Sequence, residues 1–373
     1  MKSDRSKTTV EKILALAGIQ INGGNPWDIK VHNEKFYAMV LSRGALGLGE
    51  SYMDGWWDCK AVDELFLRIL GFGLEGKIRQ NPGLLLQVIL ASLFNMQSKS
   101  RAFQVGERHY DLDNELFQNM LDRRMNYSCG YWNDAQTLDQ AQENKLDLIC
   151  RKLGLRPGMK ILDIGCGWGS FASYAAEKYG AEVTGITISR EQVELGTTAC
   201  SGLPVEIRLQ DYRTLDATFD HVVSVGMFEH VGCKNYREYM QVVHRCLKDD
   251  GLFLLHTIGG NESVTSTDPW MNKYIFPNGM LPSIKQIGAA IEGLFVMEDW
   301  HNFSADYDKT LTVWHRNFEE SWPKLKAKYS QRFYRMWKYY LLSCAGSFRA
   351  RSNQLWQIVL SKNGVPGGYT SMR

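Results

Sequence analysis

Apolar and polar positions follow two different rhythms along this chain. From Lys160 onward, short apolar runs alternate with stretches in which apolar residues recur every three or four positions. The first pattern predicts buried strands and the second predicts amphipathic helices. A regular succession of the two favours a mostly parallel sheet with helices on both faces. We expect the strands at 160–164, 182–186, 205–209, 220–225, 252–257, 295–300 and 354–360.

Helical periodicity fills most of the remaining sequence after residue 113. Two helices are expected before the first strand, with a short, aromatic, non-helical segment at 126–132 between them. The tail from Gly364 to Arg373 lacks either rhythm and is expected to be loose. The predicted helices are 114–121, 139–153, 171–178, 191–200, 236–247, 310–329 and 333–348.

The first hundred residues keep neither rhythm for long. Helices are predicted around 10–17, 63–71 and 84–94, whereas the glycine-rich stretch 44–57 is expected to be compact and irregular. A chain of 373 residues exceeds what one hydrophobic core usually serves. Because the polar, basic stretch 97–101 is typical of a hinge, we expect a smaller N-terminal domain at 1–98 and a main domain at 99–373.

Composition excludes several classes of protein. With 43 basic and 41 acidic side chains, the formal charge of +2 is too even to indicate a nucleic-acid-binding protein. The 12% of aromatic residues favours an apolar pocket or a membrane-facing surface. None of the 8 cysteines forms a C-x-x-C pair, so neither a metal site nor a disulfide framework is expected. We therefore expect the protein to work in the reducing cytosol. The polar N-terminus and the short apolar runs leave only peripheral contact with a membrane.

The strongest motif is the glycine turn that follows the strand at 160–164. Asp163 precedes Gly165, Gly167 and Gly169, a G-x-G-x-G spacing rather than the G-x-G-x-x-G of dinucleotide-binding proteins. The next strand ends at Thr187 without the acidic residue that would hold a ribose of NAD. The turn resembles the first motif of class I S-adenosylmethionine-dependent methyltransferases. A purely structural turn is the alternative, but Gln210 and Asp211, at the end of the third strand, favour the cofactor.

Further motifs resemble one family, the cyclopropane-fatty-acid synthases, over nearly the whole chain. The resemblance implies an α/β class I methyltransferase fold, Rossmann-like with a mostly parallel seven-stranded sheet, and a smaller, mainly helical N-terminal domain. It implies methyl transfer to the cis double bond of an acyl chain, followed by loss of a proton to a bound bicarbonate ion and ring closure. The matching stretches are 127–129, 187–192, 225–232, 255–258, 274–279, 298–303 and 343–349.

The same resemblance implies roles for particular residues. Glu298 would support the bicarbonate site from behind, and Cys344 ranks below the other catalytic candidates because the bicarbonate mechanism needs no thiol. The candidates around bicarbonate are Cys129, Glu229, His256, the Ile258 backbone and Tyr307. Those for S-adenosylmethionine are Tyr127, Ser128, Asp163, Gly165, Gly167, Gly169, Thr187, Ser189, Gln192, Gln210 and Asp211.

The stretch from Gly47 to Trp57 resembles the branch of the family that acts on membrane phospholipid. The resemblance implies a lipid-binding or dimerisation domain at 1–98 and a catalytic methyltransferase domain at 99–373. We therefore expect an unsaturated phospholipid as substrate, no nucleic acid, a homodimer, and a cytoplasmic enzyme bound peripherally to the inner face of the cell membrane. Trp56 and Trp57, with Lys77, Arg79, Lys99 and Arg101, belong either to an interfacial surface or, for the tryptophans, to a small core. The apolar, proline-bounded stretch 269–282 is expected to be a loop over the acyl chain.

Two rival functions are considered. A methyltransferase that forms a branched or methylene fatty acid would lose a different proton, and an altered set of bicarbonate ligands would mark it. A lipid-binding protein without activity would have lost Gly165, Gly167, Glu229 or His256, and all four are present.

Overall fold

The computed structural model describes residues 2–73, 76–78, 82–83, 85, 88 and 113–373. The chain divides into two compact units, each made of three chain segments. The helix expected at 84–94, the hinge at 97–101, the boundary between 98 and 99, and the side chains of Arg79, Lys99 and Arg101 lie outside the described residues. Unit 1 comprises Met1–Met120, Asp268–Pro277 and Leu311–Ser352, and unit 2 comprises Leu121–Thr267, Asn278–Thr310 and Asn353–Arg373.

Unit 2 is built on a seven-stranded sheet in the order β5-β4-β3-β6-β7-β9-β8. Strands β3 to β7 pair in parallel, and β9 runs antiparallel to both of its neighbours. This confirms the α/β fold with a mostly parallel sheet. The strands are β3 (Lys160–Ile164), β4 (Glu182–Thr187), β5 (Val205–Leu209), β6 (Phe219–Val225), β7 (Leu247–Gly260), β8 (Val296–Asn302) and β9 (Asn353–Ser361).

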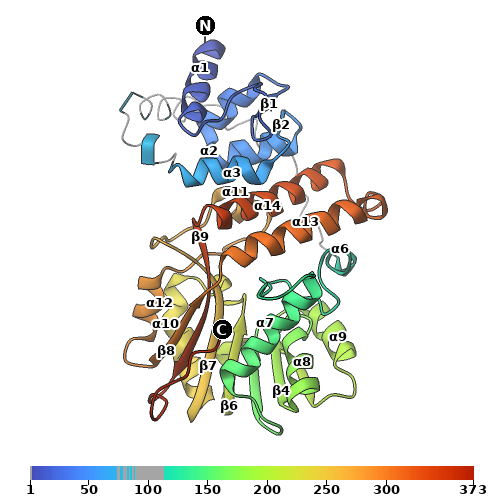
Figure 1. Ribbon diagram of the computed structural model, residues 1–373, viewed down its shortest axis with the longest axis vertical. Coiled ribbons are helices and arrows are strands. Elements are labelled where there is room, and N and C mark those ends of the chain that lie inside the picture. Colours follow the sequence, from blue (N-terminus) through green and yellow to red (C-terminus); the bar gives the residue numbers. More distant parts are fainter. Residues whose placement is uncertain (1, 74–75, 79–81, 84, 86–87, 89–112) are drawn as a thin grey trace. The chain divides into compact units, whose positions relative to one another are not determined.

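Helices cover both faces of this sheet, as the apolar strands require. Neighbouring residues of one strand point to opposite faces, so Ile161 packs into one core and Leu162 into the other. Figure 1 shows α7 and α8 on one side and α10 and α12 on the other. The helices of this unit are α7 (Leu138–Leu153), α8 (Ser170–Tyr179), α9 (Arg190–Ala199), α10 (Tyr236–Cys246) and α12 (Ile284–Ile291).

The described residues of unit 1 are mainly helical and include a small two-stranded sheet of β1 (Lys30–Val31) and β2 (Trp57–Asp58). Figure 1 shows α3 alongside α14, although the two are far apart in the sequence. Helix α13 (Ala305–Leu325) begins in unit 2 and continues into unit 1 at Leu311. The other helices are α1 (Lys2–Ala15), α2 (Lys35–Met53), α3 (Val62–Gly71), α6 (Asn114–Met120), α11 (Pro269–Tyr274) and α14 (Gln331–Arg349).

The prediction of an irregular segment at 44–57 is wrong. Helix α2 kinks at Gly44, where φ is 53°, and then continues to Met53. The glycines serve close packing rather than a turn, because a Cβ on Gly49 would stand 2.3 Å from the Trp270 ring. Trp57 is fully buried and donates to the Leu48 carbonyl at 3.1 Å, so it belongs to a core and not to an interfacial surface. Trp56 is half-buried.

Two further expectations need correction. The stretch 269–282 is not a loop throughout, because Asp268 accepts hydrogen bonds from the Trp270 and Met271 amides and starts α11. The tail is held rather than loose. Arg373 donates to both carboxylate oxygens of Asp299, and the Tyr369 hydroxyl donates to the Lys152 carbonyl at 2.9 Å.

Two properties of the described residues bear on the search for a site. Every cysteine of the chain carries a free thiol. Over the described ranges, no helix combines the length and the apolar composition needed to cross a bilayer.

The contact between α14 and α3 gives a test of the fold. A Cβ on Gly346 would stand 2.3 Å from the Asp63 carbonyl oxygen, so we expect Gly346→Ala to reduce the free energy of unfolding by about 1–3 kcal/mol. Gly71→Ala in α3 is the control, since its Cβ would meet only Leu67 at 3.9 Å. That control is expected to be neutral or slightly stabilising. Urea unfolding followed by tryptophan fluorescence measures both, and equal midpoints would contradict the close packing.

Candidate functional site

The glycine turn joins β3 to α8 at the carboxyl edge of the sheet in unit 2. Gly165, Gly167 and Gly169 have φ values of 82°, 55° and 82°. A Cβ on Gly165 would stand 2.7 Å from Met227, and one on Gly169 would stand 2.9 Å from the Cys200 sulfur. A Cβ on Gly167 would meet nothing within 4 Å. Two of the glycines therefore allow the protein to pack, and only Gly167 presents bare backbone to open space.

The candidates that follow β4 form one local hydrogen-bonded group. Thr187 donates to the Gln192 side-chain oxygen at 2.6 Å, and the Ser189 amide donates to the Thr187 hydroxyl at 3.2 Å. The Ser189 hydroxyl caps α9 by accepting from the Gln192 amide. Beside them Ile188 is 81% exposed, an apolar surface that the sequence analysis did not single out.

Gln210 and Asp211 follow β5, next to this group. The Gln210 amide donates to the Thr187 carbonyl at 3.0 Å, which joins the ends of the two strands. The Asp211 carboxylate accepts from the Arg213 side chain at 2.6 and 2.9 Å, and the Arg213 side chain lowers the pKa of Asp211. The Asp211 carboxylate, a predicted contact of the cofactor, is thus ionised and already paired with an arginine.

Glu229 lies after β6 and is almost fully buried. Its Oε1 accepts from the Ile258 amide at 2.7 Å, whereas its Oε2 has no hydrogen-bond partner among the described residues. Burial raises the pKa of Glu229 to about 7, and the Ile258 amide opposes that rise. The Ile258 backbone, expected as a direct donor to bicarbonate, donates to the carboxylate instead.

His256 stands on β7, two residues before Ile258. Its Nδ1 faces the Gln357 side-chain nitrogen at 3.3 Å, and its Nε2 has no partner within the described part of the chain. Burial lowers the pKa of His256 well below its usual value, and the charges of Lys145, Lys152 and His301 lower it further. The imidazole is therefore neutral, and because Gln357 donates to Nδ1, its proton lies on Nε2.

Cys129 belongs to the segment 122–132, which contains neither helix nor strand and includes the non-helical stretch predicted at 126–132. Its thiol is fully buried and donates to the Gly130 carbonyl at 3.1 Å, and burial raises its pKa well above the usual value. The Gly130 amide donates to the Thr310 hydroxyl at 3.1 Å. Thr310 and the buried Tyr307 share the first turns of α13, so the segment with Cys129 is fixed to the helix with Tyr307.

Aromatic rings link the segment of Cys129 to β7. The Phe303 ring lies 5.8 Å from the His256 imidazole and 5.2 Å from the Tyr131 ring. Unit 2 therefore brings together Cys129, Glu229, His256, Ile258 and Tyr307 at the carboxyl edge of its sheet, where the glycine turn also lies.

Two further candidates lie on other elements. Cys344 is on α14 in unit 1, where burial raises the pKa of its thiol to about 12. Glu298 lies near the start of β8, and its carboxylate accepts from Ser361 at 2.5 Å and from the Val365 amide at 2.8 Å. The prediction that Glu298 supports the bicarbonate ligands is wrong. Glu298 lies at the amino edge of the sheet, whereas Glu229, His256 and Ile258 lie at its carboxyl edge.

Some residues of the site were missed by sequence analysis. Lys145 is 1% exposed on α7 and donates to Asn126 and Ser128 of the segment 122–132. Its position on the apolar face of its helix was the available signal, since a lysine there is buried with a partner. Gln357 offered no such signal, because its pairing with His256 depends on the antiparallel register of β9.

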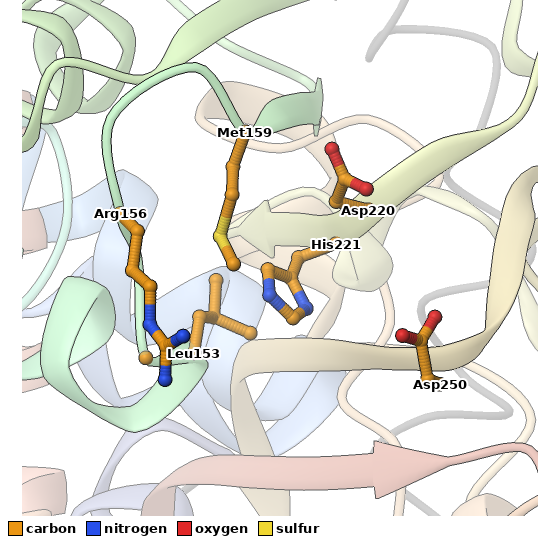
Figure 2. A pocket seen from close by; sticks show the side chains of 7 residues that line it. Leu153, Arg156, Met159, Asp220, His221 and Asp250 are labelled. Atoms are coloured by element: carbon orange, nitrogen blue, oxygen red, sulfur yellow. The ribbon is translucent and has the colours of Figure 1, made fainter.

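A hollow of about 290 Å³ in the surface of unit 2 is not this site. Figure 2 shows its lining, which includes Arg156, Asp220 and His221. These residues lie at the amino edge of the sheet, opposite the glycine turn. Asp220 already accepts from the Lys160 amide at 2.6 Å, and His221 Nδ1 accepts from the Leu252 amide at 3.0 Å. Among the residues described, no group of three or more His, Cys, Asp or Glu side chains is arranged to hold a metal ion.

Known proteins resemble this chain at both the sequence and the fold level. Residues 97–358 match the family described as mycolic acid cyclopropane synthetase. The cyclopropane-fatty-acyl-phospholipid synthase of Escherichia coli (strain K12) is 56% identical over 96% of this chain and 93% of that protein. A probable fatty acid methyltransferase of Pseudomonas putida is 41% identical over 68% of each chain.

A solved structure agrees with these sequence matches. A mycolic acid cyclopropane synthase complexed with SAH and CTAB is 34% identical, with a TM-score of 0.64, and the match covers 68% of this chain and 96% of that one. SAH, or S-adenosylhomocysteine, is what remains of S-adenosylmethionine once its methyl group has been transferred. The chain described here belongs to the mycolic acid cyclopropane synthetase family and is an S-adenosylmethionine-dependent methyltransferase.

Proposed function

We propose that this enzyme transfers a methyl group from S-adenosylmethionine to the cis double bond of an unsaturated acyl chain in membrane phospholipid and closes a cyclopropane ring. Bicarbonate is the proposed proton acceptor. The observation that carries the proposal is a pair of buried polar atoms, Glu229 Oε2 and His256 Nε2, that have no partner among the described residues. Buried polar atoms are normally hydrogen-bonded, so such a pair points to a small polar ligand.

The proposed reaction breaks one carbon–sulfur bond and one carbon–hydrogen bond. The π electrons of the alkene form a bond to the sulfonium methyl group, which leaves S-adenosylhomocysteine and a positive charge on the acyl chain. Loss of one proton from the delivered methyl group provides the electrons that close the ring. When bound, S-adenosylmethionine supplies the methyl group and bicarbonate accepts the proton.

The residues around these two atoms fit a small anion. His256 presents an N–H at Nε2, and the Cys129 thiol is held neutral by burial, so neither repels negative charge. Glu229 is the exception, but its raised pKa allows it to share a proton with an anion near neutral pH. We therefore assign Cys129, Glu229, His256 and Tyr307 to the anion, with Ile258 holding the Glu229 carboxylate in place.

Burial of the same residues protects the acyl cation. Cys129 is fully buried, His256 is 1% exposed and Glu229 is 7% exposed. Water at this point would add to the cation and give an alcohol instead of a ring. The Phe303 ring beside His256 provides an apolar, electron-rich wall that stabilises positive charge without acting as a nucleophile.

The cofactor is assigned to the loops after β3, β4 and β5. Backbone at Gly167, together with Gly165 and Gly169, would approach the amino acid part of S-adenosylmethionine, and Asp163, Tyr127 and Ser128 would lie beside it. Thr187, Ser189, Gln192, Gln210 and Asp211 would border the nucleoside part. Because Asp211 already holds Arg213, its contribution to adenine would use the remaining acceptor capacity of the carboxylate.

The choice of phospholipid rests on the relatives. The Escherichia coli enzyme, whose name specifies a fatty-acyl-phospholipid, matches 96% of this chain, whereas the match to the Pseudomonas putida protein covers 68% of it. Unit 1 also presents apolar and basic groups together. Phe72 is 49% exposed with the Lys77 ammonium 5.2 Å from its ring centre, a combination that suits a lipid interface. We place the enzyme in the cytoplasm, peripherally on the inner face of the membrane, and propose a homodimer on the resemblance alone.

Product analysis tests the reaction. With S-adenosylmethionine and vesicles of a monounsaturated phospholipid, we expect each modified chain to gain the mass of one CH₂. A methylated alkene has the same mass, so proton NMR must show the high-field signals of a cyclopropane and no remaining vinyl protons. Vinyl signals in a product of the right mass would indicate the rival methyltransferase. If no mass is gained while S-adenosylhomocysteine still binds, unsaturated phospholipid is not the methyl acceptor. The assignment to the methyltransferases would be unaffected.

The role of Glu229 with bicarbonate is tested by substitution and by buffer. Glu229→Gln keeps the acceptor for the Ile258 amide but cannot share a proton, so turnover is expected to fall by about 100-fold or more. Asp220→Asn, at the opposite end of β6, is the control and should leave turnover within about twofold. Depleting carbonate should slow the wild-type enzyme and added bicarbonate should restore it, with unchanged S-adenosylhomocysteine affinity. Turnover independent of carbonate would count against this base.

The assignment of Gly167 to the cofactor has a matched control. Gly202 also has a positive φ, 82°, and a Cβ there would likewise meet nothing within 4 Å. Both Gly167→Ala and Gly202→Ala should therefore cost about 1–2 kcal/mol of stability from backbone strain. Only Gly167→Ala is expected to weaken S-adenosylhomocysteine binding, by about tenfold or more in calorimetry. Equal affinities in the two variants would show that Gly167 does not face the cofactor.

A further inference from the structure

Lys145 is a fully buried ammonium next to the proposed catalytic residues. It projects from α7, is 1% exposed, and donates to Asn126 Oδ1 at 2.8 Å and to Ser128 Oγ at 2.9 Å. Both partners belong to the segment 122–132, which contains neither helix nor strand. A charge is rarely buried unless it is paired, so this lysine must be compensated by what surrounds it.

The segment 122–132 depends on α7 for its shape. The Gln142 side chain donates to the Ser128 carbonyl at 2.7 Å, and the Tyr131 amide donates to the Ala141 carbonyl at 2.8 Å. These two contacts and the two from Lys145 hold a stretch that has no hydrogen-bond ladder of its own. Ser128 is itself a point of attachment, and Tyr127 and Cys129 are its direct neighbours in the chain. The contacts with α7, which we call the seat of the segment, therefore determine the positions of all three residues.

Within the segment, Asn126 is itself fixed by a carboxylate. Asp122 accepts from the Asn126 amide at 2.8 Å and from its side-chain nitrogen at 2.8 Å. Asn126 Oδ1 is thereby turned toward Lys145. The order Asp122, Asn126, Lys145, Ser128 forms one buried polar chain from the start of the segment to the residue before Cys129.

The charge of Lys145 also acts on the strand that leads into the glycine turn. Asp163 on that strand is 2% exposed, and burial raises its pKa to about 7. The positive charge of Lys145 opposes that rise.

We propose that Lys145 is a positioning residue of the methyl-transfer site, whose buried ammonium holds Tyr127, Ser128 and Cys129 in place against α7. The assignment of Cys129 to the anion rests on the proposed function, whereas the seat itself does not. Lys145 touches no reacting atom. It acts through Ser128 and the rest of the segment that it holds.

The chain provides a matched control on the same helix. Lys152 is two turns further along α7 and is also 1% exposed, but its ammonium faces His301 Nδ1 at 3.1 Å and Asp299 at 3.8 Å. In the described part of the chain, the Lys152 ammonium forms no hydrogen bond or ion pair with the segment 122–132. Replacing either lysine by methionine removes one buried charge and keeps the length of the side chain.

The first experiment compares Lys145→Met with Lys152→Met by calorimetric titration with S-adenosylhomocysteine. We expect Lys145→Met to bind at least about tenfold more weakly, the size of one charged hydrogen bond, and Lys152→Met to stay within about twofold. Lys145→Arg, which restores the charge, should recover part of the loss. Equal affinity in wild type and Lys145→Met would overturn the proposal, and so would equal losses in the two methionine variants.

A second measurement uses the wild-type protein and remains valid if Lys145→Met does not fold. Burial lowers the pKa of Lys145 to about 8, so its ammonium is lost as the pH rises through that value. The affinity for S-adenosylhomocysteine should then fall between about pH 7 and pH 9, and the fall should be absent in Lys145→Arg, since arginine stays charged. Affinity independent of pH over this range would refute the role of the charge.

These readouts separate the inference from the proposed function. Binding of S-adenosylhomocysteine needs neither an alkene nor bicarbonate, so it reports on the seat alone. Product analysis of the wild-type enzyme tests cyclopropane formation independently. If the wild-type enzyme forms a cyclopropane but Lys145→Met binds S-adenosylhomocysteine normally, the role of Lys145 is refuted and the proposed function stands. If Lys145→Met binds weakly but the wild-type enzyme forms no cyclopropane, the role of Lys145 stands and the proposed function is refuted.

Discussion

The hydrogen bond from the Ile258 amide to the Glu229 carboxylate is the contact on which the rest of the site depends. It joins the ends of β6 and β7, and it lets a carboxyl group stay in a place where burial disfavours charge. The bond occupies one carboxylate oxygen and leaves the second without a hydrogen-bond partner among the described residues. Without a donor from β7, a buried glutamate would either turn to solvent or keep its proton permanently. The parallel sheet thus determines both where Glu229 lies and how readily it ionises.

The other half of the site depends on a helix instead of the sheet. Helix α7 carries Gln142 and Lys145, which hold a segment with no secondary structure of its own. Because that segment also binds Thr310 on α13, it is fixed from two sides. The architecture therefore combines strand ends, whose positions follow from the fold, with one irregular segment whose position follows from buried polar side chains. Precise placement of Cys129 requires both.

How much the sequence could reveal follows from this division. The seven strands were predictable because each contains an apolar run, whereas Glu229 and His256 were expected from the resemblance to a family. Lys145 and Gln357 were not predicted as site residues, because their hydrogen-bond partners lie far along the chain or across an antiparallel strand pair. The helix through Gly47 and Gly49 was not predicted, because glycine occurs both in turns and where a helix packs closely against a neighbour. The fixed tail was missed because Arg373 and Asp299 meet only in the folded chain.

The three-segment construction of unit 1 has a consequence for protein engineering. Gly346 of α14 lacks a side chain where α3 crosses it, and Tyr339 of the same helix packs its ring against Tyr52 and Phe66. Cutting the chain after residue 98 would leave this aromatic face of α14 in water. A shortened enzyme would aggregate unless polar residues replaced it, so the smallest soluble fragment is set by the partners of one helix and not by a linker in the sequence.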